Sequence, residues 1–348
     1  MSKILILGAG AIGTAFSFPC SDNGHSVTIV GTHLENDFID RINTNEKNHP
    51  TLQCRAEKNV KFIKFEKFEN ETRNNKIDLI VIAVSSKGIE WAGEELSKIL
   101  KEKIPILILS KGLAIHNNKY EVLAHKMERI LIKNGVKEIN ILAAGGPCLA
   151  VGLANRVHTS VVFANSNLEL ANQISKLFKT DYFHVFTSND VVGVEICSAI
   201  KNIFSMVLGA AESLSKLGTS EEMRKKNYLN TAAALFQQSI YEMVVFTENL
   251  NGKKETVMGL AGIGDLYVSD KGGRNSKMGK YLGSGMTFKE AKKNKMPDTT
   301  VEGADLALTI GSKVKKDFNI KELPLMISLI NTICEEKALN IEWNYFKQ

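Results

Sequence analysis

The sequence has few cysteines, no long apolar segment and no large excess of charge, and each shortage excludes a class of protein. The net charge of +6 over 348 residues could attract an anionic substrate, but it is too small and too dispersed to indicate nucleic-acid binding. No uninterrupted apolar run approaches the ~18 residues of a membrane span, so stable membrane insertion is not expected. The cysteines lack C-x-x-C spacing, which argues against a disulfide framework or a zinc site and favours a reducing compartment. They are Cys20, Cys54, Cys148, Cys197 and Cys334.

The rest of the composition is that of an ordinary soluble globular protein, with 44% apolar and 24% charged residues. The length predicts two domains and is sufficient for a sizeable hydrophobic core. The first residues, MSKILILGAG, hold a five-residue apolar run before the glycines, too short for a signal peptide. We therefore expect a cytoplasmic protein.

Short apolar runs alternate with helical patterns in the first half and predict a doubly wound α/β domain. The runs are continuous rather than alternating, as expected for a parallel sheet covered by helices on both faces. Three predicted helices complete the β-α-β pattern: one that ends near Asn23, one over 88–102 and one over 118–134. The predicted strands are 3–7, 26–30, 78–84, 104–109, 139–144, 159–165 and 182–188.

The pattern changes near Asn189, after which long helices are predicted without a convincing strand. We therefore predict an α/β domain over residues 1–189 and an all-helical domain over residues 190–348. The expected helices cover about 190–216, 221–251, 287–295, 302–316 and 323–337.

A glycine motif, GAGAIG at 8–13, directly follows the first predicted strand and opens a helix. This is the context that the dinucleotide-binding fingerprint requires. Gly8 permits the tight turn, Gly10 lets the backbone approach a pyrophosphate, and Gly13 allows close helix–strand packing. The N–H groups at the helix start, including those of Ala11 and Ile12, can bind the phosphates. The first domain is thus predicted to be Rossmann-like and to bind NAD or NADP.

The end of the second predicted strand bears on the choice of cofactor. NAD sites usually place an acidic residue there, against the ribose 2′-hydroxyl. This chain has Gly31, Thr32 and His33, and Glu35 comes several positions late. Nothing would repel a 2′-phosphate, and His33 could help to hold one, although no arginine is placed to grip it. The pattern favours NADPH.

Four further motifs stand out: SKG at 110–112, GGPCLA at 145–150, AIKN at 199–202 and GLAGIGDLYVSDKGGRNSKMG at 259–279. The first two follow strands at the carboxyl edge, where open α/β sheets bind ligands. The third places Lys201 in a very apolar helix. Lys201 is either a lysine that extends its charge to water or an acid–base group held in a cleft.

The motifs and their order resemble the NAD(P)-dependent glycerol-3-phosphate dehydrogenase family over roughly residues 3 to 330. The motifs occur in the same order as in the family: GAGAIGTA, SKG, GPCLA, DVVGVEICSAIKN, GLAGIGDL, GRN and VEG. The resemblance implies reduction of dihydroxyacetone phosphate to sn-glycerol 3-phosphate, whose product would feed phospholipid head groups. It also implies a homodimer.

The resemblance implies a role for each matching residue. Lys201 would transfer the proton, and its apolar helix face, shared with Val194 and Cys197, is expected to lower its pKa. Asn202 and Asp265 would hold hydroxyls or orient the ammonium, and Lys111 would reach substrate and nicotinamide. The substrate phosphate would be bound by Arg274, Asn275 and the backbone of Gly272 and Gly273, in a pocket that includes Gly146 and Cys148. The cofactor contacts would include Thr32, His33, Lys111, Ala150, Arg274 and Glu302.

Simpler interpretations stay open for several of these residues. Lys111 and Arg274 could be ordinary surface residues, and Glu302 could cap the helix that starts there. Cys148 is expected to line the pocket rather than to act as a nucleophile, because no partnered histidine is suggested. No metal site is expected, since the spacing of the histidines does not suit metal ligation. Those considered are His49, His158 and His184.

Three departures from the family pattern, Cys148, Gly152 and Gly273, keep a second function open: a dehydrogenase of another small phosphorylated hydroxy compound. A third possibility, from a different class, is a nucleotide-binding sensor that has lost turnover. Four retained residues, Lys201, Asn202, Arg274 and Asp265, argue against the sensor.

Overall fold

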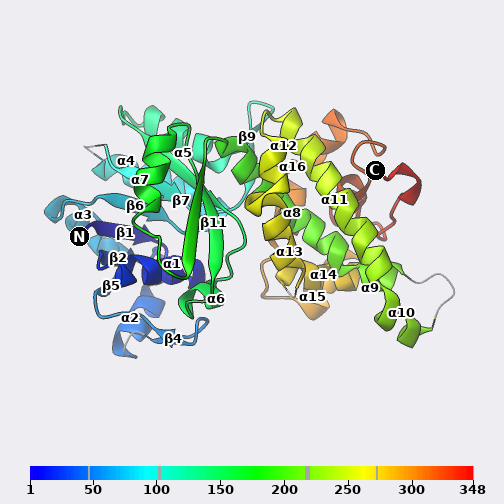
Figure 1. Ribbon diagram of the computed structural model, residues 1–348, viewed down its shortest axis with the longest axis horizontal. Coiled ribbons are helices and arrows are strands. Elements are labelled where there is room, and N and C mark those ends of the chain that lie inside the picture. The colour runs from blue at the N-terminus through cyan, green and yellow to red at the C-terminus, as the bar shows by residue number, and fades with distance from the viewer. Residues whose placement is uncertain (46–47, 101–102, 216–219, 272, 348) are drawn as a thin grey trace. The chain divides into compact units, whose positions relative to one another are not determined.

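The computed structural model describes residues 1–45, 48–100, 103–215, 220–271 and 273–347. The chain divides into two compact units, coloured along the sequence in Figure 1. The first comprises Met1–Lys111 and Val122–Val191, and the second comprises Gly112–Glu121 and Val192–Gln348. The domain boundary expected at 189/190 stays a prediction. The division into units differs from it by assigning residues 112–121 to the second unit.

The first unit is built on an eight-stranded sheet in the order β12-β11-β10-β7-β6-β1-β2-β5. Neighbouring strands are parallel except β10 and β11, which pair antiparallel with Ala144 opposite Phe163. The sheet is therefore mixed and mostly parallel rather than wholly parallel. The strands are β1 Lys3–Leu7, β2 Ser26–Val30, β5 Val60–Ile63, β6 Leu79–Ile82, β7 Pro105–Ile108, β10 Asn140–Gly145, β11 Thr159–Ala164 and β12 Phe183–Ser188.

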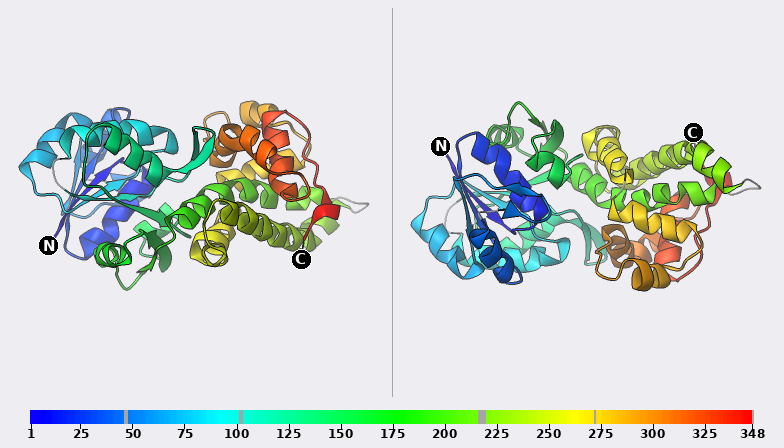
Figure 2. Two further views of the ribbon diagram at one scale, coloured as in Figure 1. Left: turned by 90° about the horizontal axis from the view of Figure 1, so that it is seen from above. Right: turned by 90° about the horizontal axis from the view of Figure 1, so that it is seen from below.

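Helices cover both faces of this sheet, and the burial of β1 shows the consequence. Ile4 and Ile6 belong to one core cluster, which includes Phe16 of α1, whereas Leu5 and Leu7 belong to the other, which includes Leu96 of α4. Because both faces are buried, every residue of the strand can be apolar. Figure 2 shows helices on either side of the sheet. The helices are α1 Ala11–Asp22, α2 Asn36–Thr44, α3 Phe68–Asn74, α4 Ile89–Ile99, α5 Leu123–Lys133, α6 Ala150–Ala154 and α7 Leu168–Ser175.

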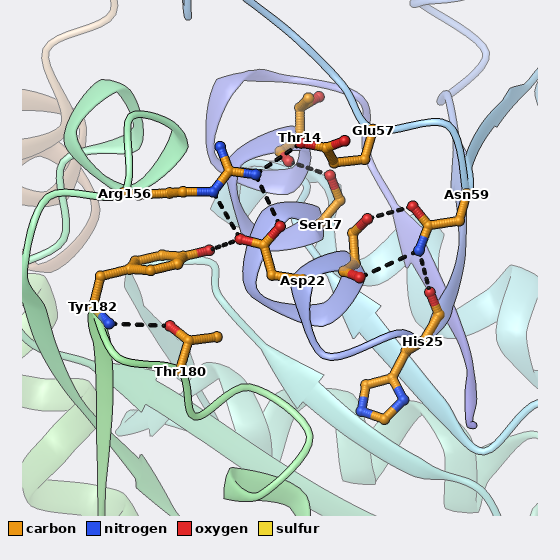
Figure 3. A network of polar contacts seen from close by, with 10 residues as sticks. Thr14, Ser17, Asp22, His25, Glu57, Asn59, Arg156, Thr180 and Tyr182 are labelled. Carbon is orange, nitrogen blue, oxygen red and sulfur yellow. Dashed lines mark hydrogen bonds and ion pairs between the residues drawn. The ribbon is translucent and has the colours of Figure 1, made fainter.

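A polar network ties the end of α1 to three other segments of the first unit (Figure 3). The Arg156 guanidinium donates to both carboxylate oxygens of Asp22 at 2.8 and 2.9 Å and to Glu57 at 2.7 Å. The Tyr182 hydroxyl donates to Asp22 at 2.6 Å. Burial alone would raise the pKa of Asp22, but the hydrogen bonds from Arg156 and Tyr182 hold it below its usual value.

Two small hairpins were not predicted. One pairs β8 (Leu113–His116) with β9 (Lys119–Val122), where the sequence predicted a helix from residue 118. Its turn residues, Asn117 and Asn118, have φ of 47° and 57°, which matches a tight hairpin turn that asparagine tolerates. The helix α5 therefore begins only at Leu123. The other hairpin pairs β3 (Asn48–His49) with β4 (Cys54–Arg55).

The second unit combines the β8–β9 hairpin with helices. Its first helix, α8 (Val191–Gly209), is the one helix among the described residues that is long and apolar enough to cross a membrane, but 89% of that apolar window is buried inside the structure. It is a core helix. The others are α9 Ala211–Leu214, α10 Glu221–Asn227, α11 Leu229–Asn249, α12 Lys254–Met258, α13 Asp265–Asp270, α14 Arg274–Gly283, α15 Phe288–Lys295, α16 Glu302–Asp317 and α17 Pro324–Cys334.

Glycines let other segments pack directly on the backbone of α8. A Cβ at Gly279 of α14 would lie 1.9 Å from the Met206 carbonyl oxygen, and one at Gly303 of α16 would lie 2.3 Å from the Asn202 carbonyl oxygen. Both distances are impossible for a side chain. The middle of α14 is thus held against α8 at Met206, and the start of α16 is held at Asn202, the residue that follows Lys201.

Candidate active site

The glycine motif forms the turn between β1 and α1 in the first unit. Gly8 has φ +113°, and a Cβ there would lie 2.8 Å from the backbone of Ala83. Gly10 is the N-cap of α1 and has no side chain with which to cap the helix. A Cβ on Gly10 would have one atom within 4 Å, a Glu35 oxygen at 4.0 Å. This open backbone next to a helix N-terminus fits the phosphates of a dinucleotide.

Glu35 folds back onto this turn, which the sequence analysis did not anticipate. Its Oε2 accepts a hydrogen bond from the Thr32 backbone N–H at 2.7 Å and one from the Ala9 backbone N–H at 3.2 Å. His33 is exposed and packs edge-on against Trp91, with ring centroids 5.2 Å apart. An acidic group therefore lies beside the end of β2, where the sequence analysis expected none, and the preference for NADPH stays a prediction.

The other predicted residues of the first unit follow β7 and β10. Lys111 is partly buried, directly after Ser110, whose hydroxyl donates to the Val84 carbonyl at 2.5 Å. Gly146 has φ +114° and a Cβ there would approach the backbone of Val161, so this position requires glycine. Cys148 and Ala150 pack, partly buried, against the core cluster of the α1 face. The role of Cys148 as a lining residue stays a prediction.

In the second unit Lys201 is buried and paired. Its side chain is 8% exposed, and Nζ donates to Asp265 Oδ1 at 2.5 Å and to Ser269 Oγ at 2.6 Å. The lysine therefore does not extend to water. The carboxylate favours the charged ammonium and burial disfavours it, so the lowered pKa expected from the sequence stays a prediction.

Ser269 is a member of this cluster that sequence reasoning missed. Its hydroxyl donates to the Asp265 carbonyl at 2.7 Å, and its own carbonyl accepts from the Ser205 hydroxyl at 3.0 Å. The signal in the sequence is the spacing of four residues from Asp265, which puts both side chains on one face of α13. Directly before α13, residues Leu260–Gly264 form a π-helical turn, a feature that often occurs at functional sites.

Asn275 links the starts of α14 and α16 to α8. Its Nδ2 donates to Asn202 Oδ1 at 2.9 Å, and its Oδ1 accepts from the Gly303 backbone N–H at 2.9 Å. Both ends of the buried amide are thus used within the protein. The contacts show Asn275 positioning Asn202, a role that the sequence did not suggest.

Arg274 and Glu302 form an exposed ion pair at 3.0 Å, with side chains 56% and 43% exposed. Val301 is the N-cap of α16 and Glu302 is an acidic residue of the first turn, so a role at the helix N-terminus stays open beside the ion pair. Gly273 is the N-cap of α14, and Gly272 lies outside the described residues.

The histidines considered in the sequence analysis differ in burial, and His49 lies near Ala9 and Glu35 at the glycine turn. His49 is buried, and its Nδ1 accepts from the N–H groups of Thr51 and Leu52. His158 and His184 are exposed, with Nδ1 and Nε2 3.2 Å apart. Within the described ranges, no group of three or more His, Cys, Asp or Glu side chains is arranged to hold a metal ion.

The structure thus gathers two sets of predicted residues, one in each unit. Lys201, Asp265, Asn202 and Asn275 lie in contact within the second unit, together with the missed Ser269. The first unit holds the glycine turn with Thr32, and separately the segments after β7 and β10.

Comparison with known proteins covers both units. Residues 3–171 match the family model described as the N-terminus of NAD-dependent glycerol-3-phosphate dehydrogenase, and residues 190–342 match the model of its C-terminus. The chain is 32% identical over 319 residues to an NADP(+)-dependent glycerol-3-phosphate dehydrogenase of Archaeoglobus fulgidus, covering 90% of this chain and 91% of that one. It is 31% identical to a glycerol-3-phosphate dehydrogenase [NAD(P)+] of Clostridium botulinum, covering 84% and 82%.

Solved structures agree on the fold. A glycerol-3-phosphate dehydrogenase of Coxiella burnetii superposes with a TM-score of 0.79 at 23% identity, covering 97% of this chain and 96% of that one. One from Saccharomyces cerevisiae gives a TM-score of 0.79 at 19% identity, covering 97% of each chain. The predicted fold class, an α/β domain followed by an all-helical region, is confirmed, and the sheet predicted to be parallel is mostly parallel, with β10 and β11 antiparallel.

Proposed function

The chain belongs to the NAD(P)-dependent glycerol-3-phosphate dehydrogenase family, and we propose that it interconverts dihydroxyacetone phosphate and sn-glycerol 3-phosphate with Lys201 as the proton donor and acceptor. The observation that carries the role of Lys201 is the buried cluster that it forms with Asp265 and Ser269. An acid–base group needs a fixed position and a controlled protonation state, and this cluster supplies the first.

The glycine turn is the proposed cofactor site. The nicotinamide cofactor, when bound, supplies the hydride to the substrate carbonyl carbon or takes it back. The backbone N–H groups at Ala11 and Ile12 would bind its phosphates, and the open side of Gly10 would admit them. We propose NAD(P)H without adopting the preference for NADPH, because Glu35 occupies the position that was expected to lack an acid.

Lys201 would work as follows in the direction of reduction. The Nζ proton passes to the carbonyl oxygen as negative charge develops there, and in oxidation Nζ accepts the proton from the secondary alcohol. Asp265 stabilises the ammonium form at 2.5 Å, and Ser269 fixes the direction of Nζ. Asn202, held by Asn275 at 2.9 Å, would bind a substrate hydroxyl with its remaining donors.

Arg274 is the proposed ligand of the substrate phosphate. Its guanidinium is 56% exposed at the start of α14, and the planar fork matches two phosphate oxygens. A bound phosphate would compete with the Glu302 carboxylate for this group. Four residues of the first unit are proposed as substrate or cofactor contacts from their motifs: Lys111, Gly146, Cys148 and Ala150.

Wider aspects of the proposal rest on the family. We propose a homodimer in the cytoplasm whose product serves phospholipid head-group synthesis. The division into a cofactor-binding domain at 1–189 and a substrate-binding domain at 190–348 belongs to the same proposal. Light scattering of the purified chain tests the dimer directly.

The test is the loss of reduced-nicotinamide absorbance with dihydroxyacetone phosphate, for the wild type and for Lys201→Met. Turnover is expected to fall by about 10²–10⁴-fold, as for lost acid–base catalysis, while the Kd for the cofactor stays within a few fold. Lys313→Met is the matched control, because Lys313 is also largely buried, at 13% exposure, and pairs with Asp317. Near-normal turnover of Lys201→Met would contradict the assignment.

A panel of other phosphorylated ketones tests the substrate. Dihydroxyacetone phosphate as a poor substrate beside a good one from the panel would favour the alternative that Cys148, Gly152 and Gly273 raise. Tight cofactor binding without turnover of any member would contradict a dehydrogenase.

A further inference from the structure

We propose that Glu35 is the residue that sets cofactor selectivity, by accepting the ribose 2′-hydroxyl of NAD(H) and disfavouring the 2′-phosphate of NADP(H). The inference rests on the proposed function only in requiring a dinucleotide at the glycine turn. It names a residue that the sequence analysis had set aside as too far from the end of β2.

The local backbone explains how Glu35 reaches the turn. Residues 32–35 form a tight turn in which the Glu35 N–H donates to the Thr32 carbonyl at 2.9 Å, and Glu35 then serves as the N-cap of α2. Gly31 makes room for the return, since a Cβ there would lie 2.7 Å from the Ile39 side chain and 3.4 Å from Glu35 Cβ. The carboxylate is thus carried back to the level at which β2 ends.

Its position is fixed by two backbone donors on separate segments. Oε2 accepts from Thr32 N–H at 2.7 Å, beyond β2, and from Ala9 N–H at 3.2 Å, inside the glycine motif. Oε1 is the atom that lies 4.0 Å from a Cβ built on Gly10, on the open side of that residue. One oxygen therefore anchors the carboxylate while the other faces the space beside the phosphate-binding turn.

That space is where a dinucleotide places its adenosine ribose, between the glycine turn and the end of the second strand. A carboxylate oxygen accepts a hydrogen bond from a ribose hydroxyl. A 2′-phosphate at the same place offers no donor when ionised and meets a like charge at short range.

Among the residues that the structure describes, the hydrogen bonds of the Glu35 carboxylate come from backbone groups. Neither of the two contacts recorded for its carboxylate among the described residues comes from a lysine or arginine. His49 interacts electrostatically with Glu35, and burial lowers the pKa of His49 although the Glu35 carboxylate partly opposes that effect. A neutral histidine does not offset the carboxylate.

The test is the affinity of the full-length protein for NAD+ and NADP+ by titration calorimetry, without substrate. Glu35→Gln keeps a side-chain oxygen that can accept from Ala9 and Thr32 but removes the charge. The ratio of Kd for NADP+ to Kd for NAD+ is expected to fall at least about tenfold in this variant. Glu35→Asp keeps the charge and is expected to keep discriminating against NADP+.

Asp37→Asn is the matched control, because Asp37 is an exposed acid two positions along that changes the net charge by the same amount. Its ratio should equal that of the wild type. An unchanged ratio in Glu35→Gln, with a melting temperature like the wild type's, would overturn the proposal, and so would an equal shift in Asp37→Asn. Because binding is measured without turnover, failure of the dehydrogenase assay would leave this result intact.

Discussion

Glu242 is a fully buried carboxyl group whose protonation is expected to control the stability of the second unit. It lies on α11, and its carboxylate accepts hydrogen bonds from the backbone N–H groups of Leu325 and Met326, at 2.8 Å each, in the first turn of α17. Gln238 donates a third hydrogen bond at 3.0 Å. Burial raises the pKa of Glu242 to about 8, and the three donors offset only part of that effect.

The sign of the pH dependence follows from this shift. An acid whose pKa is higher in the folded chain keeps a proton that the unfolded chain releases. Its stabilisation is therefore complete below about pH 4.5, the ordinary value, and is lost as the pH rises through about 8. One proton changes the free energy of unfolding by about 1.4 kcal/mol per pH unit, so the loss between pH 6 and pH 8 is about 2 kcal/mol. The N-terminus of α17 favours the carboxylate, which makes this an upper limit.

Urea unfolding of the wild type and Glu242→Gln at pH 6, 7 and 8 measures the effect. The chain has two tryptophans, Trp91 in the first unit and Trp343 in the second, so a Trp91→Phe background makes the fluorescence report on the second unit. Wild-type stability should fall relative to Glu242→Gln by about 2 kcal/mol from pH 6 to pH 8. A difference between the two proteins that is the same at both pH values would refute the reasoning, since it would mean that Glu242 does not change its charge in this range.

Two further predictions concern the first unit. Arg156→Met should raise the pKa of Asp22 and destabilise the unit by about 1–2 kcal/mol in urea unfolding at pH 7. Because the pKa of Asp22 is lowered in the fold, the difference in stability from the wild type should shrink as the pH falls below about 4. A difference that does not change with pH would contradict the pairing of Arg156 with Asp22 (Figure 3). Gly8→Ala should lower the free energy of unfolding by about 1–3 kcal/mol, because φ at this position is +113° and the new Cβ would meet the Ala83 backbone at 2.8 Å. Titration calorimetry with NAD+ should show that binding is lost, and an affinity equal to that of the wild type would mean that cofactor binding does not require this turn.

Most strands could be predicted because burial on both faces leaves an unambiguous record in the sequence. All seven predicted runs contain a strand, with ends that differ by at most two residues. The direction of β11 could not be predicted, because it depends on the connection from β10. That connection contains only the short helix α6, whereas a parallel crossover usually needs a full helix. Strands of four residues such as β8 and β9 are too short to carry a recognisable pattern.

The candidate site was predictable where a residue's type is unusual for its surroundings. Lys201 stands out in an apolar helix, and the motif at 259–265 pointed to Asp265. Ser269 does not stand out, because serine is common and its contact with Lys201 arises only when α13 packs on α8. Glu35 was set aside on its distance from β2 in sequence, and the turn at 32–35 removes that distance in space.

The cluster at Lys201 also bears on why a core helix holds a lysine at all. A buried ion pair gains little net stability, because the cost of removing two charges from water roughly cancels their attraction, and well-packed apolar residues often serve the fold better. The helix α8 is buried on all sides, and Lys201 and Asp265 are only 8% and 2% exposed as side chains. The stem cannot simply cover apolar surface while its charge stays in water, since Nζ is bonded inside the unit at 2.5 and 2.6 Å. Packing therefore gives no reason for a lysine at this position, whereas proton transfer to a carbonyl oxygen gives one, and that is why the proposed function assigns the proton to Lys201.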